Sequence, residues 1–223
     1  DQGGRLVYLG GNGFYWKIAL SPKDPGLIEI RRGESGIRAW AAEPGEYYHS
    51  FDGSYGGLWR RNGRPPQLLA GVGFSAQGKF EGSYYRRTTE SRAPDLAWMF
   101  EGIEDQEILG DFGFSGGGAA GFELDRADVR LGTPKEVRVV ASSENHTSSF
   151  VLVPEEMLTH ITNWPGEEEQ QKLIRSDIVY FRTPSGGEVF STGSITFCGS
   201  LPWNDFDNNI SRLLENVIRR FLM

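Results

Sequence analysis

An amphipathic pattern near the end of the chain leaves few architectures open. Apolar residues recur there at helical spacing, at Ile210, Leu213, Leu214, Val217, Ile218 and Phe221. Asp207, Asn208 or Asn209 can cap the amino end of such a helix. Arg219 and Arg220 stand near its carboxyl end, where positive charge is favoured. A helix with one apolar stripe needs a second layer to bury it, so we predict a terminal helix packed on a sheet.

Short β-type runs supply that sheet. Apolar and β-branched residues gather in brief segments bounded by glycine and proline, which is typical of strands. The predicted strands are 5–9, 27–31, 136–140, 177–181 and 188–197. A hairpin connection is predicted at 184–187, and 150–153 is either a strand or the entry to a helix. Acidic residues after Gly166 predict a helix that ends near Arg175. This order indicates an α/β fold, a layered mixed sheet with flanking helices.

Composition argues against two classes of partner. The chain has 23 Lys and Arg residues against 30 Asp and Glu, and the resulting charge of −7 opposes binding to nucleic acid phosphates. No run reaches the roughly 18–20 apolar residues that span a bilayer. A single cysteine, Cys198, cannot form an internal disulfide, which favours a reducing compartment. We therefore expect a cytoplasmic protein that binds neither nucleic acid nor membranes.

Length and the first residues bear on domain organisation. With 223 residues, 38% of them hydrophobic, the chain can form one domain over 1–223 with a sizeable core. The start Asp1-Gln2-Gly3-Gly4 lacks a methionine and leads directly into an apolar strand. We therefore expect this domain to be the carboxyl-terminal part of a longer subunit.

Three familiar motif types are weak here. Gly116–Gly121 matches G-x-G-x-x-G, but Phe122–Arg126 follows it where a dinucleotide site needs a long amphipathic helix, so a loop is the better interpretation. Cys198 ends a predicted buried strand, which favours core packing over nucleophilic catalysis. The histidines, at 49, 146 and 160, are scattered and show no zinc-binding spacing.

A long aperiodic stretch, Glu43–Gln67, is a candidate substrate pocket. Loops of this length inside a domain are uncommon unless they bind something. Aromatic and polar side chains of the loop that can shape a pocket include Tyr48, His49, Trp59 and Arg60. The alternative is a solvated loop with aromatic anchors and with arginines paired to carboxylates.

Two polar residues beside glycine-rich turns are candidates for catalysis. Glu123 has glycines on one side and Phe122 on the other, so it can lie in a poorly solvated cleft suited to general acid or base work. Asn12 lies in Gly10-Gly11-Asn12-Gly13 after the first strand. It either adopts a left-handed backbone or points its amide at a ligand.

Four longer blocks carry a family resemblance. They are Tyr8–Trp16, Gly57–Pro66, Leu69–Gly78 and Val189–Ser194, and each is rich in glycine, aromatic residues or both. Together they resemble the carboxyl-terminal part of the N,N-dimethylformamidase large subunit (the beta subunit) over nearly the whole chain. The resemblance implies a hydrolase that cleaves the C–N bond of small formamides, with a glutamine-amidotransferase-like core and an iron centre held by tyrosine and glutamate.

The same resemblance assigns roles and partners. Glu123 matches the carboxylate that would move the proton, and Asn12 matches the amide that would steady the developing oxyanion. A small amide is the implied substrate, with a small subunit and further copies of the chain as the protein partners to consider.

The family's iron ligands are expected before the Gly10–Gly13 turn, so no metal ligand is assigned to this chain. Tyr47, Tyr48, Tyr84 and Tyr85 are better explained as aromatic packing. We therefore predict that these residues alone are inactive. The alternative function is a non-catalytic binding or assembly module whose aromatic loop, Glu43–Gln67, docks a partner chain.

Overall fold

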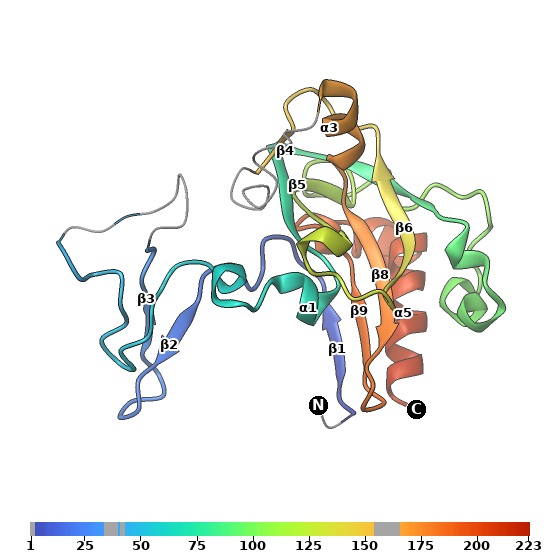
Figure 1. Ribbon diagram of the computed structural model, residues 1–223. Helices are drawn as coiled ribbons and strands as arrows, with labels where there is room; N and C mark the ends of the chain where they lie inside the picture. The colour runs from blue at the N-terminus through green and yellow to red at the C-terminus, as the bar shows by residue number, and fades with distance from the viewer. Residues whose placement is uncertain (1–2, 34–39, 41–42, 154–165) are drawn as a thin grey trace.

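A mixed sheet forms the centre of the molecule (Figure 1). The computed structural model describes residues 3–33, 40, 43–153 and 166–223. Within them, one sheet has the order β1-β9-β8-β6-β4-β5, with β7 beside β4. β1 and β9 run parallel, and the other neighbouring strands are antiparallel. The strands are β1 Arg5–Tyr8, β4 Gly73–Arg87, β5 Ala120–Arg126, β6 Arg138–Glu144, β7 Val151–Leu152, β8 Asp177–Arg182 and β9 Glu188–Ser191. The predicted α/β class with a mixed sheet is confirmed.

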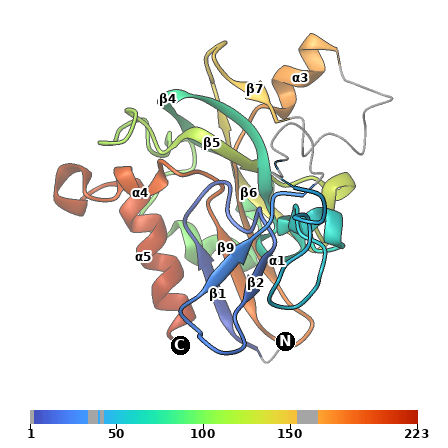
Figure 2. The ribbon, with the colours of Figure 1, turned by 90° about the vertical axis from the view of Figure 1, so that its left-hand side faces the viewer.

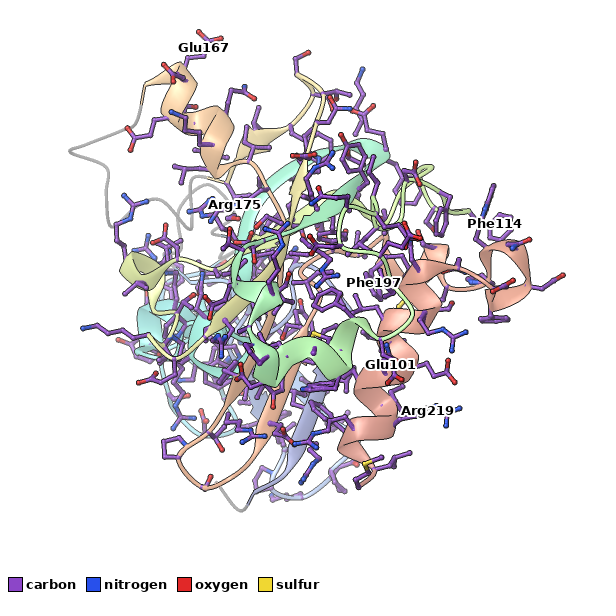
Figure 3. The ribbon with its side chains drawn as sticks, turned by 90° about the vertical axis from the view of Figure 1, so that its right-hand side faces the viewer. Glu101, Phe114, Glu167, Arg175, Phe197 and Arg219 are labelled. Carbon is purple, nitrogen blue, oxygen red and sulfur yellow. The ribbon has the colours of Figure 1, made fainter. Side chains whose placement is uncertain are left out.

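The terminal helix is confirmed as α5, Asn209–Phe221. Among the three possible caps, Asn208 takes the role, and its side chain accepts a hydrogen bond from the backbone N–H of Ser211 at 2.9 Å. The helix lies along one side of the sheet in Figure 2. Its buried face packs into the main core, together with residues of the 3-10 helix η4, Pro94–Phe100. Figure 3 shows Phe197 inside this region and Arg219 on the outer side of α5.

The predicted hairpin is formed by β8 and β9. Its connection closes when the N–H of Thr183 donates to the carbonyl of Gly187 at 2.8 Å. The predicted last strand, however, is too long, because β9 ends at Ser191 and Gly193 then adopts a φ of 65°. The chain turns there and forms the short helix α4, Phe197–Ser200.

This turn overturns the interpretation of Cys198. The residue lies in α4, not at the end of a strand, and it is exposed. Its thiol donates weakly to the carbonyl of Leu9 at 3.5 Å, and partial burial raises the pKa of the thiol. The prediction of core packing was wrong because the strand pattern of 188–197 continued past the glycine that ends it.

Helix α3, Glu167–Leu173, confirms the predicted acidic helix, although residue 165 lies outside the described residues. The undecided segment 150–153 contains β7. The longest strand, β4, was not predicted, because Gly78 and Gly82 interrupt its pattern. These glycines allow close approach: a Cβ on Gly82 would stand 2.4 Å from the carbonyl oxygen of Gly118. The glycine cluster of 116–121 therefore packs its backbone on β4 and leads into β5.

A separate arm precedes β4. Its two-stranded sheet pairs β2, Ile18–Leu20, with β3, Ile28–Ile30, and it projects away from the main sheet in Figure 1. The long loop that follows is held against β3, where the two carboxylate oxygens of Glu29 accept hydrogen bonds from the N–H groups of Ser50 and Phe51 at 3.0 Å. It continues through the 3-10 helix η2, Trp59–Asn62, to the helix α1, Pro66–Ala70.

Candidate active site

The Gly10–Gly13 turn lies directly against β5. A Cβ on Gly11 would stand 2.7 Å from the carbonyl oxygen of Glu123, so only glycine fits at this contact. Asn12 follows in the left-handed region at a φ of 60°. Asparagine tolerates this backbone better than most residues. The predicted left-handed backbone of Asn12 is therefore present. Because the turn lies so close to β5, the Asn12 side chain also points at that strand.

The two predicted catalytic residues meet at this turn. The amide Nδ2 of Asn12 donates to Oε1 of Glu123 at 3.0 Å, across 111 residues of sequence. Both side chains are half-buried. The Oδ1 atom of Asn12 is buried and has no hydrogen-bond partner among the described residues. A buried acceptor without a partner is uncommon and marks a position where a further donor can bind.

A second pair of side chains fixes the turn. The buried carboxylate of Asp125 accepts from the backbone N–H of Asn12 at 2.7 Å and from the hydroxyl of Tyr8 at 3.0 Å. The Tyr8 hydroxyl in turn accepts from the N–H of Gly13 at 2.7 Å. Burial and the charge of Asp125 raise the pKa of Tyr8, so its hydroxyl stays protonated and remains a donor.

Tyr8 and Asp125 were not predicted as site residues. Asp125 lies two positions after Glu123 in β5, a strand that was not predicted, and residues two apart face the same side of a strand. Tyr8 ends β1 immediately before the turn, a position where side chains commonly reach a site at the strand end.

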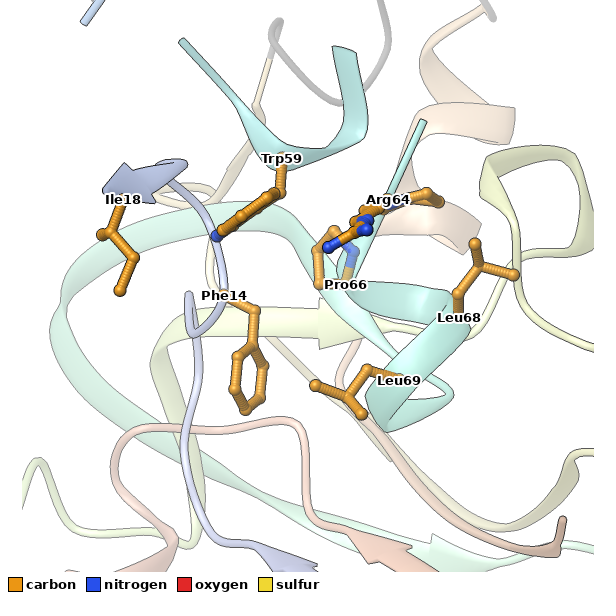
Figure 4. Close-up of a pocket in the computed structure, with 8 residues that line it drawn as sticks. Phe14, Ile18, Trp59, Arg64, Pro66, Leu68 and Leu69 are labelled. Atoms are coloured by element: carbon orange, nitrogen blue, oxygen red, sulfur yellow. The ribbon is translucent and has the colours of Figure 1, made fainter. Parts of the chain in front are cut away.

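The four predicted pocket residues do not gather around one cavity. Trp59 lines a groove of about 460 Å³, shown in Figure 4, and the residues around it are Phe14, Ile18, Arg64, Pro65, Pro66, Leu68 and Leu69. Tyr48 is exposed and packs edge-on against Tyr55. The ring of His49 is buried beside the hydroxyl of Ser54 at 3.3 Å, and Arg60 lies in η2. Their role in substrate binding stays a prediction.

The described residues do not make an iron site. Among them, no three His, Cys, Asp or Glu side chains gather as metal ligands. Of the tyrosines considered, Tyr85 is fully buried, and its hydroxyl pairs with the Ser176 hydroxyl at 2.9 Å and the Thr192 carbonyl at 2.7 Å. Burial raises the pKa of Tyr85, which opposes the phenolate form that a metal needs. Tyr85 is therefore unsuited to bind iron, and the described residues offer no group of three His, Cys, Asp or Glu ligands to replace it.

The helices of the described part of the chain are all too short or too polar to cross a bilayer.

Comparison with known proteins decides the family. A family model described as "N,N-dimethylformamidase beta subunit-like, C-terminal" matches residues 1–209. The chain belongs to this family. It is also similar to the N,N-dimethylformamidase beta subunits of an Alcaligenes species and of Paracoccus aminophilus. Each is 41% identical over 221 residues, which is 99% of this chain but 29% of the relative. The chain thus spans less than a third of the length of these relatives.

The blocks that carried the dimethylformamidase resemblance converge around the Asn12 turn. Trp59 donates its backbone N–H to the carbonyl of Tyr15 at 3.0 Å, which joins the first two blocks. The hydroxyl of Ser191 donates to the carbonyl of Ala70 at 2.6 Å, which joins the last two. Ser194 forms a β-bridge with Leu124, between Glu123 and Asp125. The four blocks are therefore joined in pairs, and the last of them contacts β5 beside Glu123.

Proposed function

We propose that this chain supplies the general base and an oxyanion-stabilising amide to an amide hydrolase that cleaves the C–N bond of N,N-dimethylformamide. The observation that carries the proposal is the 3.0 Å contact between Asn12 and Glu123, the two residues to which the family resemblance assigns roles in one reaction. Membership of the dimethylformamidase beta subunit family supports the substrate class. The names of the relatives also support an assembly that contains a second type of subunit.

The geometry suits a division of labour between the two side chains. Glu123 takes a proton from the attacking water and returns it to the departing dimethylamine, which leaves formate as the second product. An asparagine amide carries two N–H groups. One of those of Asn12 orients the Glu123 carboxylate. The other is available to the oxygen that becomes negative as water adds to the formyl carbon.

Iron belongs to this proposal only as a group supplied from elsewhere. A metal beside the formyl oxygen would polarise the carbonyl and lower the barrier to attack by water. Its ligands would come from outside the described residues. The glutamine-amidotransferase-like core, the single domain over 1–223 and the cytoplasmic location likewise stay predictions.

The test uses the complete polypeptide that carries these residues, together with any partner subunit that copurifies with it. Glu123→Gln keeps the shape and the hydrogen-bond acceptor but removes the base. We expect dimethylamine release to fall at least about a hundredfold, the usual size of a lost general base. Glu168→Gln is the matched control, because Glu168 is highly exposed on α3. Turnover by the Glu123 variant within a few-fold of the parent would refute the proposal.

Asn12→Gly examines the second role without backbone strain, because glycine adopts the φ of 60° freely. We expect a lower kcat with a smaller change in KM, since an oxyanion donor acts mainly in the transition state. A normal kcat for this variant would show that Asn12 has no part in the mechanism. The role of Glu123 would then depend on the Glu123→Gln variant alone.

A further inference from the structure

One face of the arm is unusually apolar. In the β2–β3 pairing, Ile18 stands opposite Ile30 and Leu20 opposite Ile28. Paired residues two positions apart share one face of a sheet. On that face the side chains of Ile18, Leu20, Ile28 and Ile30 are exposed by 37%, 61%, 59% and 51%. The neighbouring residue Ala19, which alternates with them, is buried.

The groove of Figure 4 continues this face. Ile18 lines it, and so do Phe14, Leu68 and Leu69, which are exposed by 41%, 53% and 50%. We call the β2–β3 face and the groove together the apolar arm surface. Single exposed apolar residues are ordinary, but a continuous patch from two strands and a helix marks an interaction site.

The loop that follows β3 packs against the arm, through hydrogen bonds such as that from the N–H of Gly57 to the carbonyl of Arg31 at 2.6 Å, but the face that carries the four aliphatic side chains stays exposed in the described residues. An isolated two-stranded sheet is marginally stable at best and needs packing against another element. The main sheet is not that element, because the arm projects away from it (Figure 1). An element packed on this exposed face would therefore stabilise the arm.

We propose that the apolar arm surface is covered by a segment of the same polypeptide outside residues 1–223, with apolar side chains in the groove and a carboxylate at Arg64. The inference rests on the proposed function, since it takes this chain to be part of a longer beta subunit. In the two relatives, 29% of the length corresponds to this chain, so most of each polypeptide is available as the cover.

Charge favours that occupant over a second copy. Arg64 lines the groove, with its guanidinium 5.9 Å from the centre of the Trp59 ring, and Arg61 is exposed nearby in η2. A two-fold contact between copies would bring the same basic rim against itself, which is unfavourable. An acidic partner segment would pair with it. Covalent connection also keeps the cover at high effective concentration, as a permanently buried face requires.

The cover would border the candidate active site. Phe14 lines the groove two residues after Asn12, and its ring packs on that of Tyr8 at 5.4 Å. The proposed segment therefore reaches the turn that carries Asn12.

Photocrosslinking tests the occupant directly. The photoreactive residue p-benzoylphenylalanine replaces Leu69 in the complete polypeptide, and the matched control carries it at Val151, which is exposed by 61% on β7. We expect the Leu69 variant to give a product of single-chain mass in which position 69 is joined to a peptide outside 1–223. A product of double mass, a product with another subunit, or labelling no greater than at Val151 would each overturn the proposal.

The thermal stabilities of two aspartate variants provide an independent test. Ile28→Asp should lower the thermal midpoint of the complete polypeptide by at least about 5 °C, because a carboxylate would be buried in the covered face. Val151→Asp should change it by less than about 2 °C. Equal shifts would mean that Ile28 is as exposed in the complete protein as Val151, and the proposal would fail. Neither readout uses catalytic activity, so failure here is distinct from failure of the proposed function.

Discussion

Replacing Tyr8 by phenylalanine tests whether one hydroxyl holds the Asn12 turn. The substitution keeps the aromatic ring and its contact with Phe14. It removes a donor to Asp125 at 3.0 Å and an acceptor for the N–H of Gly13 at 2.7 Å. Because burial and the charge of Asp125 raise the pKa of Tyr8, the hydroxyl is protonated and donates at neutral pH.

The size of the effect follows from these two bonds. A hydrogen bond to a carboxylate contributes about 1.5–3 kcal/mol, and a buried N–H left without a partner costs about 1–3 kcal/mol. Gly13 is only half-buried, so water can reach part of the vacated position. We therefore expect the free energy of unfolding to fall by about 2–3 kcal/mol. For a chain of this size, that corresponds to roughly 5–10 °C in Tm.

Urea unfolding and turnover should be measured on the same samples of the complete polypeptide. If the hydroxyl positions Asn12, kcat falls together with stability, whereas a change that only loosens the protein leaves kcat of the folded fraction intact. Tyr48→Phe is the control, because Tyr48 is exposed by 54% and should shift stability by less than about 0.5 kcal/mol. An equally small shift for Tyr8→Phe would refute the argument that this hydroxyl fixes the turn.

Three further predictions concern stability. Burial lowers the pKa of His146 to about 4, and the charge of Glu81 opposes this shift only in part. Between pH 6.5 and 4, the unfolded chain therefore binds a proton at His146 that the folded chain does not bind. Unfolding free energy should thus drop by about 2–3 kcal/mol from pH 7 to 4.5, and His146→Gln should remove this drop in urea titrations at both pH values. Asn208→Ala should destabilise by about 1 kcal/mol in the same assay, through loss of the α5 cap. Gly110→Ala should destabilise by about 2–4 kcal/mol, because its φ is 73° and its Cβ would stand 2.4 Å from that of Ala119.

The parts of the fold that the sequence predicted are those where local pattern and burial agree. The stripe from Ile210 to Phe221 gave α5, and the turn composition at 184–187 gave the β8–β9 hairpin. β4 escaped prediction because its register shifts twice against β5 and because glycines stand at 78 and 82. Those glycines serve backbone contacts with the cluster at 116–121, and contacts between distant segments leave no periodic signal.

The sequence named Asn12 and Glu123 as candidates, and the structure shows them in contact, but the residues that hold them in place were not predicted. The glycines around Asn12 predicted a left-handed backbone there, which the structure shows, whereas the close approach of Gly11 to Glu123 emerged only from the fold. The resemblance supplied the pairing of the two residues. Nothing local in Tyr8 or Asp125 distinguishes a residue that holds a turn from one that packs in a sheet. Their role depends on three hydrogen bonds that join β1, the turn and β5.

The conformation of Phe14 connects the turn to the apolar arm surface. Its φ of 55° is uncommon for a bulky residue and costs of order 1–3 kcal/mol unless surrounding contacts compensate. Its ring packs on that of Tyr8, and it also lines the groove, where the residue is 41% exposed. A segment seated in the groove would bury that exposed side and stabilise the strained backbone two residues from Asn12. If the proposed segment covers the arm and Asn12 acts as proposed, the two are coupled, so we expect variants that expose the groove to lower kcat without altering any group at the reacting atoms.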